Sequence, residues 1–477
     1  MSLPVNDIMH ALSTLQSEMD SLKSTVSEQR IEISGLYRRL DLKDKEILEL
    51  KRDNKTLREK LSKYEKPEKD SHNSSIPPSQ ESISSRLLRR TSSLREKSSR
   101  PSGGQPGHEG STLQSVLVAD EVEYHVPHFC QCCGTDLQEI PYKALGVRQV
   151  IDLPEIKPAV REHRVYGKQC SCGRFNKGTF PKEARSRICY GTNIRALIAY
   201  LHTVQCLPYE RICETLRECF HVELSQGTVY NILTTIQQSS SGVYEQIRSK
   251  IEDSQVVGAD ETGMDVSGKL EWGWVFQTDK LTYFYHDTSR AKTAIDKHFP
   301  KGLSGATLVT DRFAPYFNCF VKEHQICLAH LLRELNYLSE LDKKQDWSVR
   351  LRELLREAIH KRKIMKWENI PRTELFKKLD DLLNCSLNKL HQDFQRLQRS
   401  LLKHRDNIFR FLANPKIPYD NNASERAVRL VKVKQKVSGC FRSPKGADIF
   451  TQLLSVADTS KKSGMSRYKA LAILANT

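Results

Sequence analysis

The stretch Val256-Val-Gly-Ala-Asp260 decides the fold class, because it is a short apolar run that ends on an acid. A second run of this kind, Ala306-Thr-Leu-Val-Thr-Asp311, follows about fifty residues later. Short apolar runs are typical of buried strands. Since ligands bind where parallel strands end, at the carboxyl edge of a sheet, we expect an α/β sheet that brings Asp260 and Asp311 together.

The sequence between the two acids predicts the rest of this sheet. Aromatic, β-prone stretches at 272–276 and 281–285 predict a meander at one edge, and 291–299 predicts a helix. Carboxylate oxygens are the ligands that Mg²⁺ prefers, with waters and substrate phosphates in its remaining positions. Each acid alone can be an ordinary strand-end or turn residue, whereas the pair favours a magnesium site.

A third acid, Glu425, stands at the head of a predicted basic helix. With Arg429, Lys432 and Lys436 it forms one stripe, at steps of four, three and four. An acid that holds a metal beside bases that hold a phosphate backbone suits DNA cleavage; the alternative is an ordinary Glu–Arg pair worth a few tenths of a kcal/mol. The candidate phosphate-contacting residues of this region are Arg426, Arg429, Lys432, Lys436, Arg442 and Lys445.

Residues 192–250 are predicted to be helical. We expect one helix over 194–207, a second opened by Pro208 and a third capped by Ser225. Three helices in this order are similar to a helix-turn-helix. Many helical bundles have no role in DNA binding, so this pattern is only a moderate signal.

Two close cysteine pairs upstream predict a structural zinc site. Cys130 and Cys133 form a Cys-x-x-Cys-Gly stretch, and Cys170 and Cys172 form a tighter Cys-x-Cys-Gly stretch. Four thiolates arranged as a tetrahedron suit Zn²⁺, and the intervening residues have the pattern of a hairpin, so we interpret the region as a zinc ribbon. Cys132 can replace one ligand, and the alternative is a set of unligated buried cysteines.

The N-terminal stretch 8–61 carries a heptad repeat, which predicts a coiled coil. Leucine dominates one seam, β-branched residues are frequent in the other, and Asn54 is a lone amide at a seam position; these features favour a parallel dimer. The alternative is a helical hairpin within one chain. Residues 66–113 follow, rich in Ser, Pro, Gly and Arg, and are predicted to be a linker.

Composition limits the function classes. The 477 residues carry a formal net charge of +17. Much of this surplus lies in residues 71–105 and 421–477, which favours a polyanionic partner such as nucleic acid. We expect no membrane span and no secretory signal. The 13 cysteines fit free thiols and a metal site better than a disulfide framework, so we expect a cytoplasmic protein that associates with the bacterial nucleoid when bound to DNA.

Several blocks of the chain resemble the insertion-sequence sixty-six family of transposases, within the DDE superfamily. The blocks keep the family's order, and the resemblance also includes the N-terminal zipper, the linker and the cysteine pairs. The blocks are Gly258-Ala-Asp-Glu-Thr-Gly-Met-Asp265, Glu271-Trp-Gly-Trp-Val275, Thr310-Asp-Arg-Phe-Ala-Pro-Tyr316, Cys327-Leu-Ala-His-Leu-Leu-Arg333, Asp420-Asn-Asn-Ala-Ser-Glu-Arg-Ala-Val-Arg429 and Lys445-Gly-Ala447.

The resemblance implies a ribonuclease-H-like catalytic domain split by a helical insertion. It makes Asp260, Asp311 and Glu425 a triad that binds two Mg²⁺ ions for phosphodiester cleavage and strand transfer. The implied partners are double-stranded DNA, as element terminal inverted repeats and as target, and small accessory proteins of the same element. Leu331-Leu332 and Val431-Lys-Val-Lys434 depart from the family pattern. For Cys327 and His330 we favour a structural role near the active site, because two ligands are too few for a metal.

The predicted architecture is therefore multidomain α+β. Two other functions remain open: a transposase-derived DNA-binding regulator that has lost catalysis, and a structural coiled-coil protein, which leaves the acidic blocks unexplained. The expected parts are a dimerisation helix (1–65), a basic linker (66–115), a zinc ribbon (116–182), a helix-turn-helix-like segment (183–250), the first part of the catalytic core (251–341), a helical insertion (342–413) and the second part of the core with its basic C-terminal region (414–477).

Overall fold

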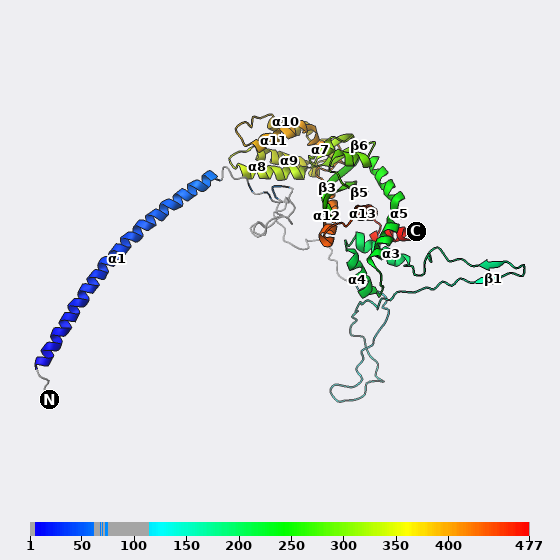
Figure 1. Cartoon of the computed structure of the whole chain (residues 1–477), viewed down its shortest axis with the longest axis horizontal. Coiled ribbons are helices and arrows are strands. Elements are labelled where there is room, and N and C mark those ends of the chain that lie inside the picture. Colours follow the sequence, from blue (N-terminus) through cyan, green and yellow to red (C-terminus); the bar gives the residue numbers. More distant parts are fainter. Residues whose placement is uncertain (1–4, 62–66, 68, 70–71, 75–113, 477) are drawn as a thin grey trace.

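A computed structural model describes residues 5–61, 67, 69, 72–74 and 114–476. The chain is a mixed α/β protein (Figure 1). Most of the predicted linker lies outside the described residues. In the part of the chain that the structure describes, no helix is long and apolar enough to cross a membrane.

A five-stranded mixed sheet forms the centre of the fold, in the order β5-β4-β3-β6-β7. β3 pairs with β6, and β6 with β7, in parallel, whereas β3, β4 and β5 form the predicted antiparallel meander. This order is compatible with a ribonuclease-H-like domain. The strands are β3 (Val256–Val266), β4 (Lys269–Gln277), β5 (Thr282–Asp287), β6 (Leu303–Thr310) and β7 (Val321–Ile326).

β3 corrects one expectation, because the strand does not end at Asp260. It runs on to Val266, since β4 continues to pair with it as far as Val266↔Lys269. The parallel pairing with β6 stops earlier, at Gly258↔Val309. Asp260 therefore lies in mid-strand, but at the carboxyl edge of the parallel part of the sheet, where β6 also ends before Asp311.

The three predicted helices of the 192–250 region are confirmed. They are α3 (Thr192–Thr203), α4 (Tyr209–Phe220) and α5 (Gln226–Glu252). The Ser225 hydroxyl caps α5 by accepting a hydrogen bond from the Thr228 amide at 3.2 Å. Their buried side chains, such as Ile198 and Leu233, belong to the same hydrophobic core as Trp274 of the sheet. These helices thus share the hydrophobic core of the sheet and do not form a separate core.

Helices from the C-terminal part of the chain pack against the antiparallel strands of the sheet, β5 above all. They are α13 (Pro444–Lys462) and α14 (Arg467–Ala475), while α6 (Lys292–His298) connects β5 to β6. The Ser455 hydroxyl of α13 accepts a hydrogen bond from the Phe284 amide of β5 at 2.7 Å. Two residues earlier in β5, the Thr282 amide donates to the Thr459 hydroxyl of α13 at 3.0 Å. Side-chain hydroxyls of α13 thus accept hydrogen bonds from backbone amides of the edge strand β5.

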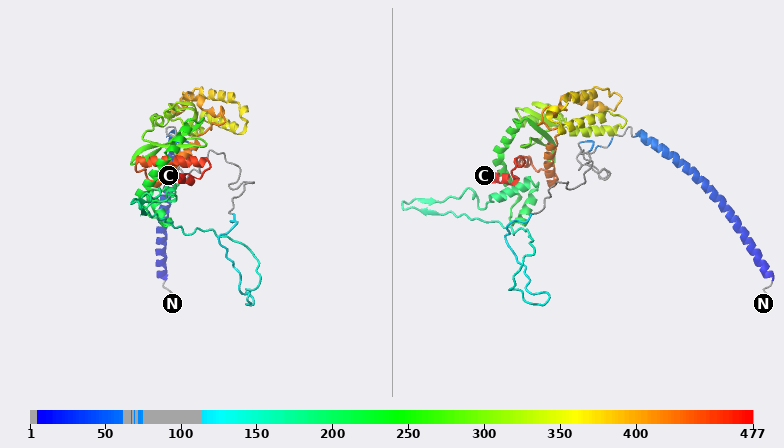
Figure 2. Two further views of the ribbon diagram at one scale, coloured as in Figure 1. Left: turned by 90° about the vertical axis from the view of Figure 1, so that its right-hand side faces the viewer. Right: turned by 180° about the vertical axis from the view of Figure 1, so that it is seen from behind.

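In the chain, a group of helices lies between β7 and α12 (Asn422–Ser438). These helices project from one end of the sheet (Figure 2). The group has its own apolar core, to which the sheet contributes Val309 and Ile326. This is the predicted insertion, although helical structure begins before residue 342. Its helices are α8 (Leu328–Leu341), α9 (Trp347–Ile364), α10 (Arg372–Leu383) and α11 (Gln392–Lys403).

The helix α12 (Asn422–Ser438) begins against β3. The Asn421 side-chain amide donates to the Ala259 carbonyl at 2.6 Å, and the Ser424 hydroxyl donates to Asn421 Oδ1 at 2.6 Å. A Cβ at Gly258 would lie 2.7 Å from Ser424 Oγ and 2.8 Å from Asn421 Oδ1. The close approach of α12 to β3 therefore requires glycine at this position.

The N-terminal residues Val5–Leu61 form one unbroken helix, α1. A helical hairpin within this stretch is therefore excluded. Side chains of the predicted seam are exposed in the single chain, as for Leu22 at 64% and Leu50 at 60%. Pairing of two such helices stays a prediction. Between α1 and α3, the described strands are the short pair β1 (Gly167–Gln169) and β2 (Phe175–Lys177).

We predict that Gly258→Ala lowers the free energy of unfolding by about 1–3 kcal/mol, the usual cost of overpacking. The added methyl group would push the first turn of α12 away from β3. Chemical denaturation measures the change. The matched control is Gly305→Ala in β6, where an added Cβ meets nothing within 4 Å, and where alanine is expected to be neutral or stabilising by up to about 1 kcal/mol. Equal effects of the two substitutions would contradict the role given to Gly258.

Candidate active site

Three acids that are distant in the sequence come together at the carboxyl edge of the parallel strands. Asp260 lies on β3, Asp311 directly follows β6, and Glu425 lies in the first turn of α12. The pKa of Asp260 is raised well above its ordinary value, mainly because burial removes water from the carboxylate. The negative charges of Glu261, Asp311 and Glu425 raise it further. The three predicted acids are therefore close enough to act on one another.

This arrangement fits a hard divalent cation. Within the described residues, neither Asp260 nor Asp311 takes part in an ion pair, and each carboxylate accepts a hydrogen bond from a nearby backbone amide. Glu425 Oε1 is buried and has no hydrogen-bond partner. Glu425 differs from the other two acids, because His330 Nε2 and Arg333 Nη2 each lie 3.6 Å from its carboxylate oxygens. Carboxylate oxygens are ligands suited to Mg²⁺. The three acids thus suit Mg²⁺ by the chemistry of their donor atoms, although their ligand atoms do not all lie within 4.8 Å of one another.

Glu261, the neighbour of Asp260, is engaged differently. Its side chain is 3% exposed and forms an ion pair with Arg290 at 2.7 Å. The Tyr316 hydroxyl donates to its other oxygen. Arg290 also packs over the rings of Trp272 and Phe313. Sequence reasoning did not single out these partners, although Tyr316 closes one of the quoted blocks and Glu261 lies within another.

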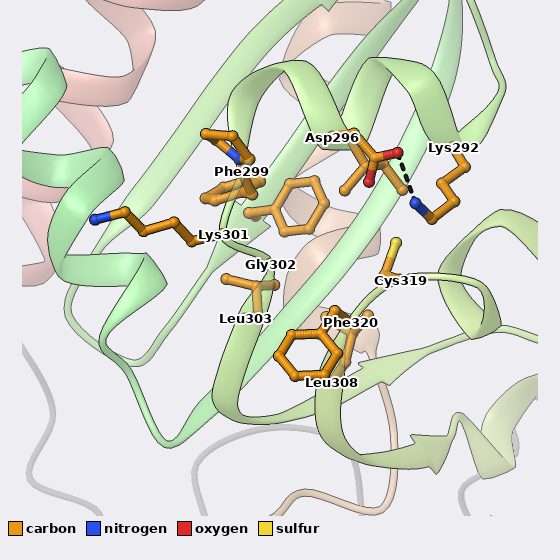
Figure 3. A pocket seen from close by; sticks show the side chains of 12 residues that line it. Lys292, Asp296, Phe299, Lys301, Gly302, Leu303, Leu308, Cys319 and Phe320 are labelled. Carbon is orange, nitrogen blue, oxygen red and sulfur yellow. Dashed lines mark hydrogen bonds and ion pairs between the residues drawn. The ribbon is translucent and has the colours of Figure 1, made fainter.

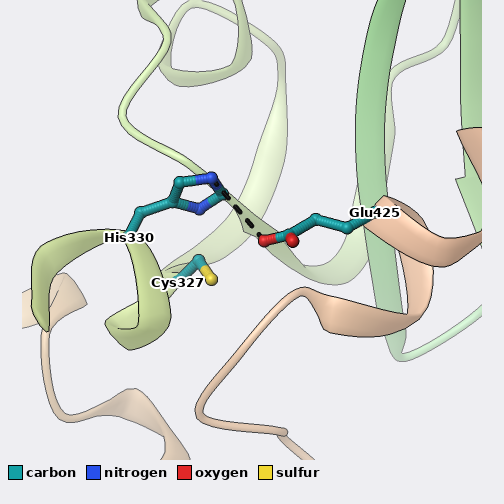
Figure 4. Close-up of side chains that lie close together, drawn as sticks. All are labelled: Cys327, His330 and Glu425. Carbon is teal, nitrogen blue, oxygen red and sulfur yellow. Dashed lines mark ion pairs between the residues drawn. The ribbon is translucent and has the colours of Figure 1, made fainter. Parts of the chain in front are cut away.

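The start of α8 places Cys327 and His330 against Glu425 (Figure 4), and Arg333 of the same helix also lies close to that carboxylate. His330 Nε2 lies 3.6 Å from Glu425 Oε1, and Arg333 Nη2 lies 3.6 Å from Glu425 Oε2. Burial lowers the pKa of His330 and raises that of the Cys327 thiol to about 12. The Cys327 sulfur accepts a hydrogen bond from the Asn421 amide at 3.1 Å. These residues support the third acid and the turn that carries it.

The same contacts add Glu425 to Cys327 and His330 as a third potential metal ligand, which the sequence did not indicate. One ligand atom each from Cys327, His330 and Glu425 lie within 4.8 Å of one another. Among the described residues this is the one such group of three His, Cys, Asp or Glu side chains. Glu425 also interacts electrostatically with Asp260. Its carboxylate therefore belongs to two potential metal-binding groups, one with Cys327 and His330 and the other with Asp260 and Asp311. The long-range contact between α8 and α12 that creates this arrangement has no local signal in the sequence.

The four cysteines of the predicted zinc ribbon are not brought together. Each pair does lie in a tight turn: the Gly134 amide donates to the Cys130 carbonyl at 3.0 Å, and the Gly173 amide donates to the Cys170 carbonyl at 2.9 Å. Both glycines have positive φ. Hydrogen bonds from Thr135 lower the pKa of the Cys133 thiol to about 7. Each half therefore has a geometry that suits a metal, while the joined site is not confirmed.

The basic candidates near Glu425 are exposed. All six of Arg426, Arg429, Lys432, Lys436, Arg442 and Lys445 have high solvent accessibility. Glu425 does not pair with Arg429 as the i, i+4 alternative required; it pairs with His330 and Arg333 instead. Lys434, on the other face of α12, is buried and donates to the Leu207 carbonyl at 2.7 Å. The predicted stripe is thus a solvent-facing basic surface beginning at the acids.

Two cavities flank the sheet. One, of about 530 Å³, lies between α6 and β6 and is lined by Lys292, Phe299 and Phe320 among others (Figure 3). Its acid Asp296 pairs with Lys292 at 2.6 Å. The other, of about 630 Å³, is lined by Asp311, Arg312 and His330 and by residues of the N-terminal region. The second cavity is the relevant one, because Asp311 is part of its lining.

Comparison with known proteins gives two family matches and a relative. Residues 187–449 match the transposase IS66 family, and residues 18–114 match a family of unknown function. An uncharacterized protein, y4jO, of Sinorhizobium fredii (strain NBRC 101917 / NGR234) is 28% identical over 166 residues, which are 35% of this chain and 51% of that protein. The chain thus spans about half the length of this relative. Because the first match covers more than half of the sequence and includes Asp260, Asp311 and Glu425, the chain belongs to the transposase IS66 family.

Proposed function

We propose that this transposase-family protein cleaves and rejoins DNA at the ends of an insertion sequence, in a reaction that depends on divalent metal ions. The observation that carries the proposal is the convergence of Asp260, Asp311 and Glu425 at one sheet edge, where Asp260 and Asp311 form no ion pair among the described residues and the pKa of Asp260 is raised by burial and by the neighbouring acids. Family membership supports a transposase function. The assignment of these acids as the catalytic triad is our inference from their geometry.

Asp260, Asp311 and Glu425 would hold a pair of Mg²⁺ ions. Bound there, the metal would supply Lewis-acid activation of a water or DNA 3′-hydroxyl and would stabilise the leaving oxygen. The chain's own residues orient the site. His330 and Arg333 orient the Glu425 carboxylate. Arg290 and Tyr316 bind both oxygens of Glu261, so this acid is not counted among the metal ligands.

The exposed basic residues after Glu425 would hold the DNA backbone. Contacts of Lys and Arg with phosphates position a duplex but carry no sequence information. Recognition of terminal repeats would therefore fall to the helices α3–α5 and to the cysteine-containing segment. Pairing of two α1 helices would bring two element ends together before cleavage. Small accessory proteins of the same element are further expected partners.

We predict that Asp260→Asn, Asp311→Asn and Glu425→Gln each reduce strand cleavage at element ends by at least about a hundredfold, because each removes a metal ligand. Cleavage of oligonucleotide ends in Mg²⁺ measures the effect. The matched control is Asp296→Asn, which removes an acid paired with Lys292 outside the site and should leave cleavage unchanged.

Wild-type cleavage rates in all three triad variants would refute the assignment. If the unmodified chain binds inverted repeats but cleaves none of them in the presence of any divalent metal, Mn²⁺ included, it is the non-catalytic regulator instead.

We also predict that Asp260→Asn raises the thermal stability of the metal-free protein at neutral pH. The folded pKa of Asp260 is raised, so the stability this group contributes is present at acid pH and lost as pH rises through that pKa. Each unit of pKa shift corresponds to about 1.4 kcal/mol, and a gain of a few degrees in Tm is expected. Melting in EDTA at pH 7 and pH 4 measures it. The gain should shrink at pH 4; a lower Tm for the variant at pH 7 would contradict the electrostatic account.

For the cysteine pairs we predict about one bound Zn²⁺ per chain, as a four-thiolate site requires. Cys133→Ser and Cys172→Ser should each lower the zinc content measured by elemental analysis. The control is Cys385→Ser, since Cys385 is exposed in the helical insertion. Equal zinc content in all variants would show that these pairs do not form the site.

A further inference from the structure

Part of the N-terminal region is docked on α8. The Asn73 side chain is 2% exposed, and its amide donates to Glu340 Oε2 at 2.7 Å. The Asn336 amide of α8 donates to the backbone carbonyl of His72 at 3.2 Å. A polar side chain is stable in a buried position only where it forms hydrogen bonds of this kind. We call the described residues Lys69, His72, Asn73 and Ser74 the strap.

The surface that receives the strap is organised by the helical insertion itself. Asn336 is buried, and its carbonyl accepts a hydrogen bond from Arg352 of α9 at 2.9 Å. This bond orients the amide that holds the strap backbone. The Lys69 ammonium lies 5.6 Å from the ring centre of Tyr337, the next residue of α8. Asn336, Tyr337 and Glu340 thus form a specific receiving surface.

The strap residues Lys69, Asn73 and Ser74 help to line the cavity of about 630 Å³. Asp311, Arg312 and His330 line it too, so the cavity adjoins one of the three acids. The volume lies within the range of ligand-binding pockets.

The cavity lining suits one nucleotide of a DNA strand. Its cations are Lys69, Arg312 and Arg396, and its rings are Phe313 and Tyr337. Arg312 pairs with Glu334, and Arg396 lies 3.5 Å from Asp393. Rings and guanidinium groups bind bases by stacking, and cations bind the phosphates between them. Lys69 is the cation that the strap adds to this set.

We propose that the strap, Lys69 with His72, Asn73 and Ser74, completes a nucleotide subsite beside Asp311 by docking on α8. The N-terminal region, which matches a family of unknown function, then takes part in holding the strand that is cut. The inference rests on the proposed function for its ligand, whereas the docking of the strap stands independently of it.

The test uses the full chain with an exchange of partners at the strap. Asn73→Asp places a carboxylate against Glu340 and should release the strap. Asn73→Asp combined with Glu340→Gln restores a donor and an acceptor and should dock it again. Glu340→Gln alone is the matched control, because its amide oxygen can still accept from Asn73. Hydrogen exchange at residues 69–74 and at α8 reports docking directly.

The released variant should show a KM for an end-containing oligonucleotide that is higher by about tenfold, with kcat within about twofold, as expected for loss of one binding contact. The double variant should recover the KM. Lys69→Gln should keep the strap protected, yet reduce the slope of log binding constant against log salt by about one.

Unchanged hydrogen exchange in Asn73→Asp would overturn the docking. Faster exchange with an unchanged KM and unchanged DNA affinity would overturn the subsite and leave the strap as a structural tether. If the wild-type chain cleaves no DNA, the proposed function fails separately. Hydrogen exchange and the DNA affinity of these variants then still decide the strap and the subsite.

Discussion

The contact between Gly258 and the first turn of α12 determines the geometry of the whole site. β3 contributes Asp260 two residues after this glycine, and α12 contributes Glu425 one residue after Ser424. Any side chain at position 258 would strike Ser424 and Asn421. The bond from Asn421 to the Ala259 carbonyl then fixes the register between helix and strand. Two segments separated by the entire helical insertion are thereby placed with their acids facing each other.

The insertion is more than a spacer between these segments. Its first helix, α8, begins immediately after β7, and it carries His330 and Arg333 to the Glu425 carboxylate. At the same junction the Cys327 sulfur accepts from the Asn421 amide. Movement of the insertion relative to the sheet would therefore move the third acid. The same helix holds the strap through its Asn336 and Glu340, so one element contacts both the N-terminal region and Glu425.

Local patterns in the sequence predicted most strands and helices, because each has its own periodicity or cap. The apolar runs before Asp260 and Asp311 and the Ser225 cap are examples. β7 was missed, since its polar sequence Val321-Lys-Glu-His-Gln-Ile326 has no strong strand pattern. The end of β3 was also misjudged, because the pairing with β4 that extends it is not encoded in β3. The partners of Glu425 were missed for a related reason: contacts between α8 and α12 depend on tertiary structure alone.

Asp260 and Glu261 show how neighbouring acids in one motif acquire different roles. Successive side chains of a strand point to opposite faces of the sheet. Burial raises the pKa of Glu261, and hydrogen bonds from Tyr316 and Arg290 partly offset this rise. Burial also raises the pKa of Asp260, and the charges of Glu261, Asp311 and Glu425 raise it further. Basic and hydroxyl partners thus reduce the cost of burying Glu261, whereas Asp260, left among other acids, destabilises the fold until a cation binds. The unfavourable environment of Asp260, rather than its place in the sequence motif, is thus the physical argument for a metal-binding role.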